Sequence, residues 1–279
     1  MDRIPVFYAE EILAESDSRS PSAGKPRDVV AAWELAGLPI DLRPILPVSA
    51  EDLSLAHDPS FVRAILACEA DNGFENRRPD VAKSLPYTNG AMLGAASLAL
   101  QRGVACAPVS GFHHAQYNVA KWFCTFNGLM VTAIKLMRDE RVRRVMILDL
   151  DQHNGDGTDE IIERLNVSGV ENVTFGRWYA NETFADEYMT TLDQQVRRFA
   201  KFDLILYQAG ADVHVDDPLG GVLTTEQMRE RDRMVFAAAK RSGTPVAWNL
   251  AGGYQEPVSN VVALHVNTMR ECVACYCAP

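Results

Sequence analysis

The 279-residue sequence has no long hydrophobic run, and its basic residues are fewer than its acidic ones. No window approaches the roughly 18 consecutive apolar residues that a membrane-spanning helix needs, so we expect no membrane span. Lysine and arginine number 27 against 37 aspartates and glutamates, which gives a formal net charge of −10. Because a chain with this charge gains no affinity from counterion release, direct nucleic-acid binding is not expected.

Cysteine is also scarce, with six residues in the whole sequence. Cys68, Cys106 and Cys124 are scattered among apolar residues, which is typical of buried thiols in a reduced, cytoplasmic protein. The other three lie in 272-CVACYC-277, where a metal clip is the weaker interpretation because no second ligand pair lies nearby. The N-terminal residues include acidic side chains and no long apolar stretch, so a signal peptide is not expected.

Short apolar runs alternate with longer helical patterns along the sequence. The runs are continuous rather than alternating, which is typical of strands that are covered on both faces. They predict strands at residues 4–8, 104–109, 145–151, 172–175, 203–208 and 244–250. Helices are predicted at about 90–102, 127–138, 157–166, 187–200, 224–240 and 257–269.

This alternation predicts an α/β fold in a single domain over residues 1–279. The sheet should be mostly parallel, with helices on both faces. We find no internal repeat. The polar segment 15–28 contains proline and glycine, and it is interpreted as a surface loop rather than a linker between domains.

Polar side chains follow four of the predicted strands, at the edge where open parallel sheets bind their ligands. The four segments are 110-SGFHHAQYN-118, 149-DLDQHNGDGT-158, 209-AGADVHVDDPLGG-221 and 251-AGGYQE-256. Each combines titratable or hydroxyl groups with glycine. Four such segments in equivalent topological positions predict one shared site.

Asp151 and His153 are spaced to bind one metal ion, because residues two apart in an extended segment point to the same side. Asp212, from the loop after another strand, would complete the set. Two carboxylates and one imidazole balance a divalent cation and leave a coordination position open, as in catalytic metal sites. For an isolated D-x-H pattern, the alternative is a capped strand end.

The adjacent His113 and His114 are candidates for acid–base chemistry. A histidine serves best in this role when a carboxylate fixes its tautomer through the other ring nitrogen. Asp149 and Asp156 are available as two such partners. A bare His-His dipeptide is more often a pair of ordinary histidines, so this interpretation depends on the surrounding segments.

Together these segments resemble the histone deacetylase family, within the arginase/deacetylase fold. The matching stretches are GFHHA with WFCTFN, DLDQHNGDGT, AGAD with DDPLGG, AGGY, 57-HDPSFV-62 and 87-YTNGAMLGAA-96. The resemblance is closest to class IV-like deacetylases of the bacterial type, because of the short loop 174–184 and the ending GGYQ.

The resemblance implies a zinc-dependent amidohydrolase, with Fe2+ as an alternative metal and a structural K+ near the end of the 145–151 strand. The metal ligands that it implies are Asp151, His153 and Asp212. The catalytic residues that it implies are His113 and His114, their orienting partners Asp149 and Asp156, and the hydroxyl donor Tyr254.

The resemblance also implies an aromatic substrate channel. Phe123 is expected to form one wall, and Gly252 to allow a tight turn in the AGGY segment. Trp122 stands where family members commonly have glycine, so its indole is expected to narrow or redirect the channel. Trp178 or Tyr179 is expected to supply the opposite wall. The alternative for these two residues is packing beneath a shortened loop.

The implied reaction is the removal of an acyl group, acetyl or longer, from an amine. The substrate is an acylated lysine in a peptide or protein, or alternatively an acylated polyamine or other small amine. A binuclear manganese ureohydrolase of the same fold would need carboxylates at two positions that are Gly155 and His214 here. A catalytically inactive binding module is disfavoured because the implied ligands, both histidines and Tyr254 are present.

Overall fold

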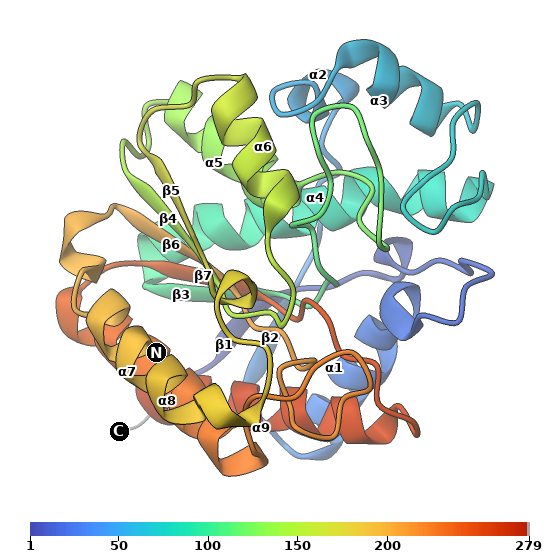
Figure 1. Cartoon of the computed structure of the whole chain (residues 1–279). Coiled ribbons are helices and arrows are strands. Elements are labelled where there is room, and N and C mark those ends of the chain that lie inside the picture. Colours follow the sequence, from blue (N-terminus) through green and yellow to red (C-terminus); the bar gives the residue numbers. More distant parts are fainter. Residues whose placement is uncertain (278–279) are drawn as a thin grey trace.

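The computed structural model describes residues 1–277 and is built around one seven-stranded sheet (Figure 1). Every pairing between its strands is parallel. The strands lie side by side in the order β2 (Ile40–Arg43), β1 (Ile4–Phe7), β3 (Val104–Ala107), β7 (Val246–Asn249), β6 (Leu204–Gln208), β4 (Val145–Asp149) and β5 (Val170–Thr174). The predicted parallel α/β sheet is confirmed.

Helices cover both faces of this sheet, as predicted. In Figure 1, α2 to α6 lie on one side of the sheet, and α1, α7, α8 and α9 lie on the other. The bounds are α1 (Lys25–Leu35), α2 (Ala50–Leu53), α3 (Pro59–Leu66), α4 (Pro79–Arg102), α5 (Gly128–Arg138), α6 (Asp156–Arg164), α7 (Ala185–Val196), α8 (Thr225–Ser242) and α9 (Ser259–Tyr276). Within residues 1–277, no helix is long and apolar enough to cross a membrane.

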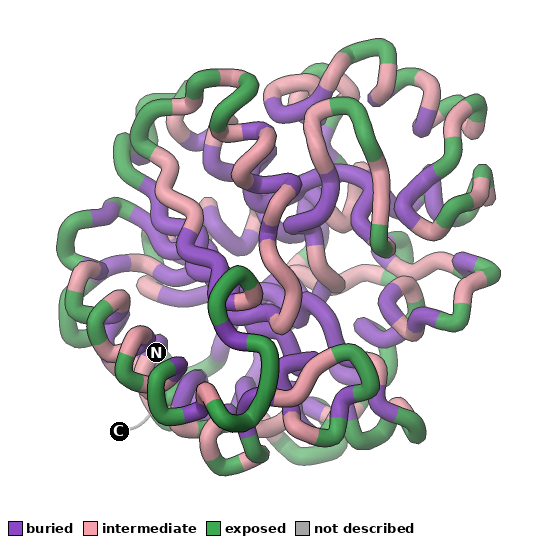
Figure 2. The backbone as a smooth tube through the Cα atoms, viewed as in Figure 1, coloured by how far each residue is buried: buried purple, intermediate pink, exposed green. Residues whose placement is uncertain are grey.

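The two faces of the sheet belong to two hydrophobic cores, because successive side chains of a strand point in opposite directions. In β4, Met146 and Leu148 join the core that includes residues of α1, α7, α8 and α9. Val145 and Ile147 join the core that includes residues of α4 and α5. Figure 2 shows that the buried backbone is concentrated in the middle of the molecule. Burial on both sides explains why the strands read as continuous apolar runs.

Several elements were not predicted from the sequence, namely β2 and the helices α1, α2 and α3. The prediction of a surface loop over residues 15–28 is wrong for its second half. This half contains the 3-10 turn Pro21–Ala23 and the start of α1, and Ser22 and Lys25 are buried there. Lys25 is buried because its ammonium group donates to the carbonyl of Ala251, which is 226 positions away in the sequence.

Candidate active site

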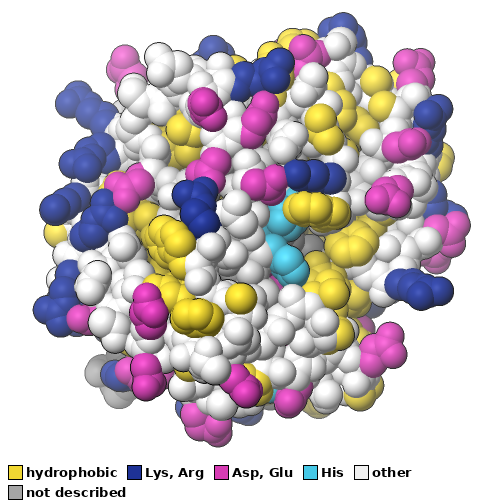
Figure 3. Space-filling model, viewed as in Figure 1, with side chains coloured by type: hydrophobic (Ala, Val, Ile, Leu, Met, Phe, Trp, Pro, Cys, Tyr) yellow, Lys and Arg dark blue, Asp and Glu magenta, His cyan; other side chains and the backbone are white. Residues whose placement is uncertain are grey.

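The four polar segments lie at the carboxyl ends of β3, β7, β6 and β4, which are consecutive neighbours in the sheet. The loops that follow these strands therefore meet. Figure 3 shows imidazole surface in a hollow near the middle of this face, bordered by hydrophobic side chains. A small cavity of about 20 Å³ lies here, and its lining includes His113, His114, Asp151, His153 and Tyr254.

Asp151, His153 and Asp212 each place a possible ligand atom within 4.8 Å of the others. They are the one such group of three found in residues 1–277, so the cysteines of 272–277 form none. The Nδ1 atom of His153 lies 3.2 Å from a carboxylate oxygen of each aspartate. Burial and the adjacent Asp151 raise the pKa of Asp212. Two carboxylate oxygens and one imidazole nitrogen this close together are a ligand set that suits a divalent metal.

A second metal ion, as in a binuclear ureohydrolase, would need carboxylates at positions 155 and 214, and neither position supplies a ligand here. Gly155 lies against Asp149, so a Cβ atom there would be 2.6 Å from the Asp149 Oδ2 atom. His214 is engaged elsewhere, because its Nε2 atom lies 3.0 Å from Thr225 Oγ1 and its Nδ1 atom accepts from the Asp216 N–H group. The site therefore favours one ion over two.

Each of the two adjacent histidines meets a carboxylate through its Nδ1 atom. His113 Nδ1 lies 2.7 Å from Asp149 Oδ2, and His114 Nδ1 lies 2.9 Å from Asp156 Oδ1. The two imidazole rings are 4.0 Å apart between centroids. A carboxylate at Nδ1 fixes the tautomer and leaves Nε2 for the cavity.

The pKa values of the two histidines shift in opposite directions. Burial opposes the charged form of His113, but the carboxylates of Asp149 and Asp151 outweigh it and raise its pKa to about 9. Burial and the neighbouring charge of His113 lower the pKa of His114, against the opposing effect of Asp156. At neutral pH, His113 therefore carries a proton while His114 is free to accept one.

Gln208, at the end of β6, contacts the buried pair of His113 and Asp149, and it was not predicted from the sequence. Its Nε2 atom donates to Asp149 Oδ1 over 2.9 Å, and its Oε1 atom accepts from the Phe112 N–H group over 3.1 Å. The amide thus links Asp149 to the loop that carries the histidines. The signal available in the sequence was a glutamine at the end of the apolar run 203–208, and the structure shows that it is fully buried.

Tyr254 follows a segment that lies directly against the carboxylates of Asp151 and Asp212. The Gly252 N–H group donates to Asp151 Oδ2 over 2.9 Å. A Cβ atom at Gly252 would lie 2.0 Å from Asp212 Oδ2, so only glycine fits there. Burial and the nearby Asp212 raise the pKa of the Tyr254 hydroxyl well above its ordinary value. The hydroxyl group therefore remains protonated and can donate a hydrogen bond.

Two buried side chains that were not predicted, Lys25 and Asp217, form hydrogen bonds with the backbone of residues 251–254. The Lys25 ammonium group donates to the carbonyls of Ala251 and Gly252 over 2.6 and 3.2 Å. Asp217 Oδ2 accepts from the Tyr254 N–H group over 2.7 Å. Burial lowers the pKa of Lys25 to about 8, although nearby carboxylates oppose this shift. Lys25 did not stand out, because it lies in a segment with ordinary loop composition. Asp217 lies in the polar segment 209–221, but no role was predicted for it.

Of the aromatic residues predicted for the channel, Trp122 and Phe123 line the small cavity beside His113 and His114. The Phe123 ring lies 5.9 Å from that of Tyr254. Trp178 and Tyr179 are not among the lining residues. Tyr179 is buried in the core, which fits the packing alternative, whereas Trp178 is 47% exposed at the surface. The lining also includes Ser22, Gly111 and Cys124, for which the sequence predicted no role.

A family model described as the histone deacetylase domain matches residues 28–170 and 168–269. The chain belongs to the histone deacetylase family. This assignment places it among deacetylase hydrolases, in agreement with the resemblance of its motifs.

Two relatives of this deacetylase family member are similar to part of its sequence. Histone deacetylase 2 of Arabidopsis thaliana is 30% identical over 194 residues, which are 62% of this chain and 50% of that protein. The acetoin utilization protein AcuC of Staphylococcus aureus (strain MRSA252) is 29% identical over 143 residues, which are 41% of this chain and 36% of that protein.

Two solved structures show the same fold. The acetylpolyamine aminohydrolase from Burkholderia pseudomallei has a TM-score of 0.73 at 17% identity, covering 97% of this chain and 99% of that one. The HD domain of HDA15 has a TM-score of 0.80 at 19% identity, covering 100% of this chain and 90% of that one. The predicted arginase/deacetylase fold is thereby confirmed.

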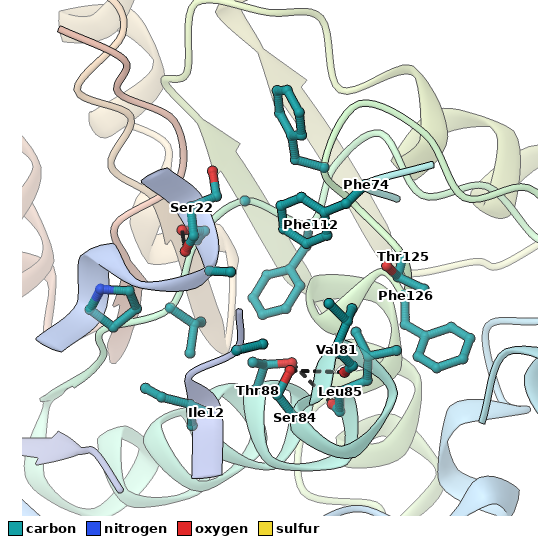
Figure 4. Close-up of a pocket in the computed structure, with 17 residues that line it drawn as sticks. Ile12, Ser22, Phe74, Val81, Ser84, Leu85, Thr88, Phe112, Thr125 and Phe126 are labelled. Atoms are coloured by element: carbon teal, nitrogen blue, oxygen red, sulfur yellow. Dashed lines mark hydrogen bonds between the residues drawn. The ribbon is translucent and has the colours of Figure 1, made fainter. Parts of the chain in front are cut away.

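A second cavity of this deacetylase, of about 60 Å³, adjoins the first and shares Ser22, Gly111 and Phe123 with it. Figure 4 shows the rings of Phe74, Phe112 and Phe126 around it, with side chains from α4. The hydroxyl groups of Ser84 and Thr88 donate to carbonyls of their own helix, to Val81 and Leu85 respectively. The cavity therefore presents mainly apolar surface.

Proposed function

We propose that this chain hydrolyses the amide bond between a short acyl group and an amine, with one zinc ion held by Asp151, His153 and Asp212. One observation supports the proposal above all. Two histidine–aspartate pairs and the tyrosine segment converge on the group of metal-binding side chains. The amine is a lysine side chain or a small acylated amine such as a polyamine.

When bound, the cation polarises the substrate carbonyl and lowers the pKa of water. His114, which is neutral at neutral pH, accepts the proton of the attacking water. The Tyr254 hydroxyl group donates to the oxyanion of the tetrahedral intermediate, a contact worth about 10²–10³-fold in kcat in comparable sites. The bond between the water oxygen and the acyl carbon forms, the C–N bond breaks, and a histidine proton passes to the leaving amine.

The sizes of the two cavities support a short acyl group. They measure about 20 Å³ beside the catalytic residues and about 60 Å³ in the adjoining apolar space. An apolar cavity of about 150 Å³ is known to hold benzene, so these spaces hold only a few carbon atoms. An acetyl group fits, whereas a fatty acyl chain would require side chains to move.

The first test measures amide hydrolysis with zinc, with Fe2+ and after chelation. The substrates are an acetyl-lysine peptide, an acetylated polyamine and a myristoyl-lysine peptide. We expect metal-dependent release of acetate and little release of myristate. The free thiols of all six cysteines support a reducing compartment such as the cytoplasm, so the assay contains a reductant.

Elemental analysis separates this proposal from its alternatives. Tyr254→Phe should keep one zinc ion per chain while losing about 10²–10³-fold in kcat. Two manganese ions per chain would contradict the one-ion proposal. One bound metal without hydrolysis of any amide would indicate a binding module. The same measurement tests the K+ that the family resemblance leads us to expect near Asp149.

A further inference from the structure

Arg231 is a charged side chain of α8 that is completely buried, although it does not line the small cavity. Its Nε atom donates to Asp232 Oδ1 over 2.8 Å, so its charge is balanced by the next residue of the helix. A buried ion pair gains little stability over apolar side chains of similar volume, because both charges lose their hydration. The contacts of the guanidinium group with other parts of the fold are therefore more informative about its role than the ion pair.

The guanidinium group reaches the backbone of the two loops that carry Asp151 and Asp212. Its Nη1 atom donates to the Gly210 carbonyl over 2.7 Å and to the Leu150 carbonyl over 3.4 Å. These two residues stand just before the two aspartates, on the loops that follow β6 and β4. Pairing between β4 and β6 ends before both carbonyls, so the strand ladder does not extend to them. One nitrogen of the guanidinium group thus joins the two loops.

The Gly210 backbone also lies directly against Asp151, so the two loops are in contact. A Cβ atom at Gly210 would lie 2.6 Å from Asp151 Cα and 2.8 Å from Asp212 Oδ1. The next N–H group, that of Ala211, donates to the Gly252 carbonyl over 3.0 Å. The peptide between Gly210 and Ala211 is therefore held at its oxygen by the guanidinium group and at its nitrogen by Gly252. A shift of this peptide would change the separation of the two aspartates.

We propose that Arg231 is a positioning residue that sets the separation of the Asp151 and Asp212 carboxylates and thereby the affinity of the site for zinc. This inference rests on the zinc site of the proposed function. One guanidinium nitrogen contacts a carbonyl of each loop while another donates to Asp232, and the single ammonium group of a lysine cannot reproduce this geometry. Replacing a residue that orients metal ligands typically lowers metal affinity by about 10–100-fold.

Arg231→Lys is the first variant, because it keeps a positive charge beside Asp232 and should fold. Its zinc affinity, measured at neutral pH by competition with a chromophoric chelator, should be about 10–100-fold lower than that of the wild type. A second variant combines Arg231→Met with Asp232→Asn, which removes both charges together and leaves no unpaired buried charge. Its zinc affinity should fall at least as far. This measurement requires no turnover of substrate.

Thr268→Val provides the matched control, since it removes the hydrogen bond of 2.6 Å from the Thr268 hydroxyl group to Asp232 Oδ2 and leaves Arg231 in place. It should lower the melting temperature, whereas its zinc affinity should equal that of the wild type.

Wild-type zinc affinity in either folded variant of Arg231 would overturn the inference. A loss of zinc affinity in Thr268→Val as large as that in Arg231→Lys would also overturn it, because it would indicate a structural role alone. Failure of both Arg231 variants to fold would indicate the same and would overturn it too. A wild type that binds no zinc would instead overturn the zinc site of the proposed function, and the inference with it.

Discussion

The two histidine–aspartate pairs share one geometry but lie in different surroundings. In the first pair, His113 and Asp149 are both buried, and Gln208 donates a second hydrogen bond to the aspartate. In the second pair, the Asp156 side chain is 30% exposed and also accepts from Lys121. The first pair faces further carboxylates, whereas the second faces cations.

This difference shows that pairing with an aspartate does not by itself set the proton affinity of an imidazole, because burial and the other neighbouring charges differ between the two pairs. Carboxylates raise the pKa of His113 to about 9 against the effect of burial. Burial and the charge of His113 lower the pKa of His114 although it has its own aspartate. The adjacent His113 and His114 thus provide one imidazole that carries a proton at neutral pH and one that can accept a proton.

The largest expected effect comes from removing one imidazole at a time. His114→Ala should lower kcat by about 10²–10⁴-fold, because it removes the group that accepts the proton of water. His113→Ala should lower kcat less, since His113 already carries its proton at neutral pH. Steady-state kinetics with metal analysis checks both variants. A larger loss in His113→Ala would reverse the two roles.

The two aspartates should differ in their effect on folding stability. Asp149→Asn breaks a buried pair and should lower the free energy of unfolding by about 3–5 kcal/mol. Asp156→Asn weakens a partly exposed pair and should lower it by less than about 1 kcal/mol. Urea denaturation at pH 7, with both variants at the same metal concentration, measures the two values. Equal losses of unfolding free energy in the two variants would show that burial does not make the first pair more important for stability than the second.

The pH dependence of the free energy of unfolding should reveal the contribution of the His113–Asp149 pair. Because the pKa of His113 is raised to about 9 in the folded chain, its stabilising contribution is complete below about pH 6.5 and is lost as the pH rises through 9. Lys25, with a pKa lowered to about 8, acts in the opposite direction at higher pH. The difference between wild type and Asp149→Asn, measured on chelated protein, isolates His113. A flat difference from pH 6 to 9 contradicts the prediction.

The smallest expected effect concerns Lys121. Removing its charge in Lys121→Met should let Asp156 stabilise protonated His114 more strongly and so raise the pKa of His114. The acidic limb of the kcat/KM profile should then move to higher pH. Lys135→Met, a change in a surface lysine paired with Asp139, should leave the limb in place. A shift toward lower pH would show that Lys121 does not act through Asp156.

The sequence predicted those parts of the site whose residues follow strands. Asp151, His153 and the two adjacent histidines could be identified because a parallel sheet brings the carboxyl ends of its central strands together. Lys25 could not be identified, since its burial depends on the carbonyl of Ala251, 226 positions away. Tyr179 could not be placed either. Its hydroxyl bonds to Thr191 in α7, which leaves the ring in the core.

The sequence by itself determined the parallel sheet, the metal-binding candidates and the family, because hydrophobic periodicity and motif spacing are local properties of the chain. Only the tertiary structure decided which histidine holds a proton, since that depends on the charges that the fold brings around each ring. The tertiary structure also decided that Trp122 stands edge-on to His114, because a hairpin turn with two positive φ angles directs the indole there.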